Sequence, residues 1–224
     1  AGGGDSDREA LYVFQPKLFY YSPKYSVNVI GDLNNIGEVV FDRRDARNFS
    51  GGFRSPSANS GTNISLGDND IGFLTLQNNR ANSIESKLLA TNFSYSPKST
   101  LDLSGFAIFS SSKIETQQNS SVLYTDPNLG IPDETTEDNT TQGTDTGLFK
   151  FSANYKPNAN NQLDYDIYGR LSTDSKDQDF FSSNLGKIQQ TENGTPFSIN
   201  QNFNYYYTLN EKNIFAVSAQ SLIQ

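Results

Sequence analysis

Two aspartates, Asp164 and Asp166, come closest in type and spacing to a catalytic pair. They lie two positions apart, so a β-strand would project both carboxylates from one face. General acid–base chemistry would also require a pocket and a raised pKa for one of them. The chain has no His and no Cys, which excludes Ser-His-Asp and Cys-His catalysis, disulfides and the usual zinc sites. We therefore expect no enzymatic activity, no metal and no cofactor.

The composition is that of a folded, acidic chain. Its 224 residues carry a formal net charge of −8, and 12% of them are aromatic. A disordered chain would be poor in aromatics, and an acidic chain without a basic patch is a poor nucleic-acid binder. No apolar run reaches the about 18 residues of a membrane-spanning helix. The chain begins without Met and ends without a terminal aromatic residue, so we expect a piece of a longer protein.

Period-two alternation dominates the sequence and predicts β-strands. The clearest example is the segment 163–171, with the apolar positions Leu163, Tyr165, Ile167 and Leu171 alternating with Asp164, Asp166, Tyr168 and Arg170. Similar segments start at Tyr25 and Leu89 and cover 149–155 and 197–207. We expect about eight strands, each with one apolar, aromatic face and one polar face.

Short and long connections alternate between these strands. Short ones, rich in Pro, Asn and Ser, lie at 22–24, 96–99, 156–161 and 210–213. Long polar stretches lie at 35–84, 113–146 and 175–195. This order is typical of an antiparallel transmembrane β-barrel with short periplasmic turns and long extracellular loops. We expect residues 1–224 to be part of one such outer-membrane domain; a secreted β-sandwich remains the soluble alternative.

The barrel interpretation assigns the side chains to environments. The polar face would line the lumen, where charges either contact a plug and tune passage or form a solvated network; these are Asp102, Lys150, Asp164, Asp166 and Arg170. An aromatic girdle would lie at the membrane interface beside the short turns, made of Tyr21, Tyr25, Tyr95, Tyr155 and Tyr207.

The first long stretch combines arginines with aromatic side chains. They are Arg43, Arg44, Arg47, Phe49, Phe53 and Arg54. Guanidinium and aromatic groups together could bind an anionic or sugar ligand. Alternatively, the loop caps the barrel and packs its own aromatics.

A family resemblance rests on the segment 18–38, LFYYSPKYSVNVIGDLNNIGE, and on the later stretches 78–85 and 204–213. These resemble the barrel of TonB-dependent outer-membrane receptors of Gram-negative bacteria, in the branch with an N-terminal carboxypeptidase-regulatory-like domain. The resemblance implies a barrel of about 22 strands, of which this chain would supply about eight. It holds neither the plug nor a TonB box.

The resemblance also implies a function and partners. The parent protein would take up a nutrient such as an iron chelate, a glycan or a peptide. Its partners would be outer-membrane lipid, a TonB-type energy-transducing complex acting on the plug, and a surface lipoprotein. The alternatives are a small eight-stranded outer-membrane barrel with an adhesive or structural role, and a secreted β-sandwich binding module.

Overall fold

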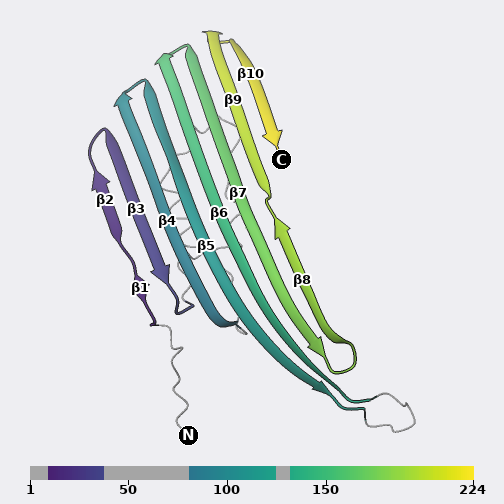
Figure 1. The fold of residues 1–224 in the computed structure, drawn as a ribbon. Coiled ribbons are helices and arrows are strands. Elements are labelled where there is room, and N and C mark those ends of the chain that lie inside the picture. Colours follow the sequence, from purple (N-terminus) through teal and green to yellow (C-terminus); the bar gives the residue numbers. More distant parts are fainter. Residues whose placement is uncertain (1–9, 38–80, 125–131) are drawn as a thin grey trace.

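The computed structural model describes residues 10–37, 81–124 and 132–224. These residues form ten strands in a single antiparallel sheet (Figure 1). The strands are β1 (Val13–Phe14), β2 (Lys17–Tyr21), β3 (Tyr25–Asn34), β4 (Ala81–Lys98), β5 (Leu101–Val122), β6 (Glu134–Asn158), β7 (Asn161–Ser182), β8 (Gly186–Gly194), β9 (Phe197–Asn210) and β10 (Asn213–Ile223). In these ranges no helix is long and apolar enough to cross a membrane.

Two prolines divide what would otherwise be continuous strands. β1 and β2 both pair with β3 in one register, and the break between them contains Pro16. β8 and β9 both pair with β7 in one register, interrupted at Pro196. Proline lacks the N–H that the ladder needs, but each proline carbonyl still accepts a hydrogen bond, from Gly31 N (2.8 Å) and Ser172 N (2.9 Å). The ten strands therefore occupy eight positions across the sheet, as expected.

The four expected short turns all form hairpins at the same end of the sheet (Figure 1). They connect β2 with β3, β4 with β5, β6 with β7, and β9 with β10. Asn and Ser side chains close several of them: Ser22 Oγ accepts from Tyr25 N, and Asn210 Oδ1 accepts from Lys212 N. The order of strands and turns is thus confirmed for the described residues.

The prediction of three long loops is mostly wrong. Residues 113–122 and 134–146 continue β5 and β6, and residues 175–194 are largely β7, a turn and β8. The polar residues pair in register along the whole length, so the ladder continues where the hydrophobic signal stops. The stretch 35–84 lies mainly outside the described residues, and 81–84 belong to β4.

The strands are staggered in one direction across the sheet. Tyr25 shares a cross-strand row with Tyr95 and, through β5, β6 and β7, with Phe203. β3 begins at this row, whereas β9 continues about seven residues further to Asn210. About seven residues of offset over five strand spacings corresponds to a tilt of roughly 45°. β-barrels have tilts of about 35–45°.

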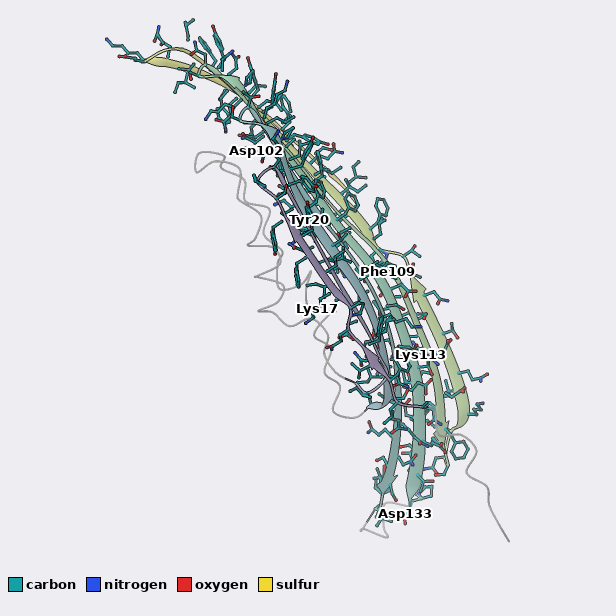
Figure 2. All side chains as sticks on the ribbon, turned by 90° about the vertical axis from the view of Figure 1, so that its left-hand side faces the viewer. Lys17, Tyr20, Asp102, Phe109, Lys113 and Asp133 are labelled. Atoms are coloured by element: carbon teal, nitrogen blue, oxygen red, sulfur yellow. The ribbon has the colours of Figure 1, made fainter. Side chains whose placement is uncertain are left out.

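The sheet is curved, so that it has a convex side and a concave side (Figure 2). Phe109 and Lys113 lie on the convex side, and Lys17 lies on the concave side. Within the described residues no pairing joins β10 to β1 or β2, so the sheet is open there. The fold is therefore an open, curved, all-β antiparallel sheet.

Candidate functional site

The convex face carries a continuous apolar band. The cross-strand register places one alternating set of side chains from β4 to β9 on this face. It includes Leu89, Phe93, Leu103, Phe109, Phe149, Phe151, Tyr165, Ile167, Leu171, Ile199 and Phe203. None of the strand residues described in this band is charged. Four of these side chains are exposed, Phe109 by 54% and Leu171 by 51% among them, and the other seven are half-buried.

The height of the band matches a bilayer. On β9 it runs from Phe197 to Tyr207, about 33 Å along the strand at about 3.3 Å per residue. A tilt of roughly 45° reduces this to about 23 Å along the membrane normal. The apolar belt of outer-membrane barrels is about 25 Å tall.

Phenylalanines lie over glycines on this face. Phe93 pairs with Gly105, and Phe149 pairs with Gly169. A Cβ built on Gly169 would lie 2.2 Å from the Phe149 ring, and one on Gly105 would lie 2.7 Å from the Phe93 ring. Each glycine thus makes room for a neighbouring ring, which fills the gap in the surface.

Tyrosines gather where the band meets the short turns. Tyr95 and Tyr155 lie on the convex face, and Tyr25 stacks on Tyr20 with ring centroids 5.2 Å apart. Tyr207 belongs to the same face. Tyr21 does not: it pairs with Ser26 and therefore lies on the opposite face. Tyr20 takes the place predicted for Tyr21, because the consecutive tyrosines alternate sides.

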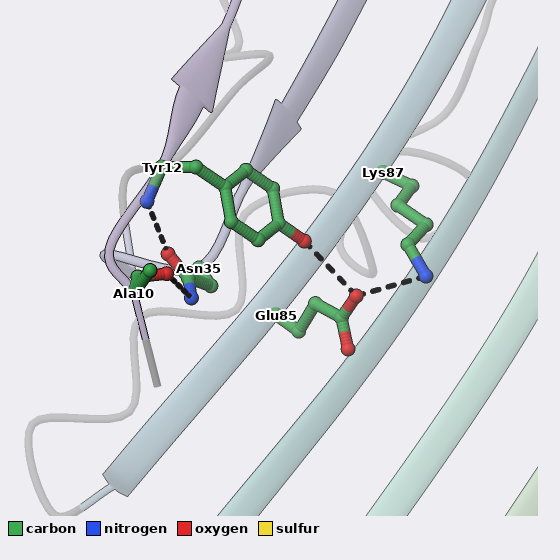
Figure 3. A network of polar contacts seen from close by, with 5 residues as sticks. All are labelled: Ala10, Tyr12, Asn35, Glu85 and Lys87. Atoms are coloured by element: carbon green, nitrogen blue, oxygen red, sulfur yellow. Dashed lines mark hydrogen bonds and ion pairs between the residues drawn. The ribbon is translucent and has the colours of Figure 1, made fainter. Parts of the chain in front are cut away.

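The other end of the band is bordered by charges. Lys87 and Asp145 share the first row beyond Phe109, and Glu85 and Lys113 share the next. Glu85 Oε1 accepts from Lys87 Nζ (2.8 Å) and from the Tyr12 hydroxyl (3.1 Å) (Figure 3). The hydrogen bond from Lys87 holds the pKa of Glu85 below its ordinary value, with Tyr12 adding to the effect.

The concave face carries hydrogen-bonded polar side chains at the level of the band. Asp166 accepts from Ser152 Oγ at 2.5 Å, and Asp164 accepts from Asn154 Nδ2 and Gln162 Nε2. Asp164 is completely buried. On β3 and β4, Asn28 donates to Asn92 at 2.7 Å. These carboxylates are therefore held by amides and hydroxyls, which is how a protein accommodates buried charge.

A second group on the concave face is apolar and buried. It comprises Leu88, Ala90, Phe106, Ile108, Leu148 and Tyr168, and Leu148 is only 1% exposed. The alternation argument assigned this whole face to polar residues and missed the group. The signal was available in uninterrupted apolar runs, such as 88–90 and 106–109. Such runs place apolar side chains on both faces of a strand.

The predicted site residues separate into three sets. Asp102, Lys150, Asp164, Asp166 and Arg170 all lie on the concave face, as their spacing required, and their role in a lumen stays a prediction. Asp102 accepts a hydrogen bond from Ser96 at 2.5 Å. The ligand-contact set Arg43, Arg44, Arg47, Phe49, Phe53 and Arg54 lies outside the described residues. Of the predicted tyrosines, all lie on the convex face except Tyr21, and their role at a membrane interface stays a prediction.

Comparisons with known proteins give a structural likeness but no family. No family model matches the chain, and no curated protein matches it. Among solved structures, the crystal structure of the P. putida toluene transporter TodX matches 92% of this chain at 11% identity, with a TM-score of 0.32. The match covers 53% of TodX, so the chain spans about half the length of that protein.

Proposed function

We propose that this chain forms part of the wall of an outer-membrane β-barrel that takes up a nutrient. The observation that carries the proposal is the uncharged apolar band on the convex face, whose aromatic and aliphatic side chains are exposed or half-buried rather than buried. A soluble sheet would bury such a face in its core. Here the buried residues lie on the other side, which is the inside-out arrangement of a transmembrane barrel.

The open sheet favours the interpretation that the chain is an arc of a large barrel rather than a small closed barrel. An eight-stranded barrel would need β10 to pair with β1 or β2, and the described residues contain no such pairing. The tilt of roughly 45° is compatible with either size. The polar side chains on the concave face favour a polar solute over an apolar one.

The finer form of the proposal is a TonB-dependent receptor. It rests on the sequence resemblance of residues 18–38 and would supply a plug and an energy-transducing partner. The solute would then be an iron chelate, a glycan or a peptide, bound in part by Arg43, Arg47 and their neighbours in the sequence between β3 and β4.

Fractionation of Gram-negative cells tests the proposal. An antibody against residues 113–146 is used to probe outer-membrane, periplasmic and secreted fractions by immunoblot. We expect an outer-membrane band much larger than the 24.8 kDa of this chain. Peptide sequencing of that band by mass spectrometry should then find a plug domain if the protein is a TonB-dependent receptor.

Each other outcome supports a named alternative. An outer-membrane band near 25 kDa would mean a small barrel with an adhesive or structural role. A band found only in secreted, detergent-free fractions would mean a β-sandwich module and would refute both barrel forms. A large membrane band without a plug would retain the barrel and reject the TonB-dependent form.

A further inference from the structure

The two borders of the apolar band have different chemistry. At the turn end, the convex face carries tyrosines, including Tyr95, Tyr155 and Tyr205. At the other end, β4 and β5 place two lysines and their acidic partners in the first rows beyond the band. Because short turns face the periplasm in such barrels, the lysine border is on the cell-surface side.

The two lysines are close neighbours on the sheet. Lys87 pairs with Ser111, and Lys113 pairs with Glu85, so the lysines are diagonal across β4 and β5. Diagonal side chains start about 7–8 Å apart, a gap that one phosphate group can bridge between two long ammonium-bearing side chains.

Both lysines are accessible from the membrane side. Their side chains are 50% and 54% exposed. Glu85 holds Lys87 at 2.8 Å, and Glu115 holds Lys113 at 2.6 Å. Neighbouring acids therefore fix the ammonium groups at the border rather than leaving them to extend into solvent.

We propose that Lys87 and Lys113 bind phosphate groups of the glycolipid of the outer leaflet. The inference rests on the proposed function, since it requires the convex band to be embedded in the outer membrane. Interfacial lysines are attracted to anionic headgroups at the surface. The surrounding acids Glu85, Glu115 and Asp145 add negative charge, so Mg²⁺ bound between phosphate and carboxylate should strengthen the contact.

Lipid analysis of the purified protein tests the site. The protein is expressed at its natural length, extracted from outer membranes in detergent, and its bound phosphorylated glycolipid is quantified by mass spectrometry. The Lys87→Gln/Lys113→Gln double variant should retain at least threefold less glycolipid than the wild type. EDTA should lower the wild-type amount.

Lys187→Gln is the matched control. Lys187 lies on the same convex face and also pairs with an acid, Asp179, at 3.6 Å. It is about six residues further from the band along the strands, or about 20 Å. This control should leave the bound glycolipid unchanged, and a Lys87→Arg/Lys113→Arg variant should retain it.

The outcomes separate the site from the proposed function. If the double variant fractionates with the outer membrane and keeps the full amount of glycolipid, the site is refuted and the membrane assignment stands. If the wild type is absent from the outer membrane, both are refuted. Vesicles containing phosphatidylglycerol replace the glycolipid in a second arm, and equal retention there would show that any phosphate headgroup suffices and overturn the preference for the glycolipid.

Discussion

Paired glycines and phenylalanines on the convex face allow a test at single residues. Gly169→Ala places a Cβ 2.2 Å from the Phe149 ring, so the ring must move. We expect a loss of about 1–3 kcal/mol in the free energy of unfolding, as for other overpacked positions. Urea unfolding of the protein in lipid vesicles measures it.

Gly147→Ala is the control for this prediction. Gly147 also faces the convex side, paired with Phe109 and Leu171. A Cβ there would meet no atom within 4 Å, so alanine should be neutral or stabilise by up to about 1 kcal/mol. Equal losses at both positions would contradict the packing of Phe149 over Gly169.

The acidic residues at the border of the band should make the stability of the protein depend on pH. Lys113 lies beside Glu115 and holds the pKa of that carboxyl below its ordinary value of 4.5. A lowered folded-state pKa gives stability that is present above 4.5 and lost as the pH falls through the lower folded value. Unfolding midpoints measured between pH 6 and pH 3 should therefore fall less steeply in Glu115→Gln than in the wild type. The difference should be small because both side chains are well exposed.

At the scale of elements, Pro196 is the interruption that can be removed. β8 and β9 keep one register on β7, so Pro196→Ala should join them into one strand. The new N–H would donate to the carbonyl of Ser172, a gain of about 0.5–1.5 kcal/mol. Amide hydrogen exchange should show new protection at residue 196. Unchanged exchange, or a shifted register in β8, would contradict this account.

The sequence predicted the strands and their faces better than their ends. Alternation placed Asp164 and Asp166 on one face and Tyr165 and Ile167 on the other, and the register bears this out. Alternation of hydrophobicity disappears where both faces are polar, so it could not show that β5 and β6 continue to Val122 and from Glu134. Strand pairing there depends on backbone hydrogen bonds, which no side-chain pattern records.

The candidate site was predictable only in part, for a related reason. Spacing determines which residues share a face, so the concave polar set followed from the sequence. It cannot determine which members are covered, and it missed the buried group around Leu148. The border pair Lys87 and Lys113 was missed as well, because a cross-strand contact depends on the register between β4 and β5.

At the scale of the whole molecule, the embedding of the convex face is tested by two adjacent residues. Phe93 and Ser94 lie near the middle of the band on opposite faces, and both are exposed. In a bilayer, Phe93→Lys should cost about 2–4 kcal/mol and Ser94→Lys much less. Urea unfolding in vesicles measures both. Phe93→Ala separates the ring packing over Gly105 from the burial of charge, and equal costs for the two lysines would refute the assignment of faces.

The continuation of β5, β6 and β7 beyond the band has a consequence for intact cells. About 13 residues of β5 follow Phe109, or roughly 40 Å of strand beyond the band. A protease cleaves an extended segment whose backbone is free, whereas here β5 pairs with β6 as far as Val122, and β6 pairs with β7 from Thr136 onward. The proposed topology places residues 113–122 and 134–146 at the cell surface, and treatment of living cells with a broad-specificity protease should leave them uncut although they are hydrophilic. Surface accessibility and susceptibility to digestion would thus be separate properties of this part of the chain.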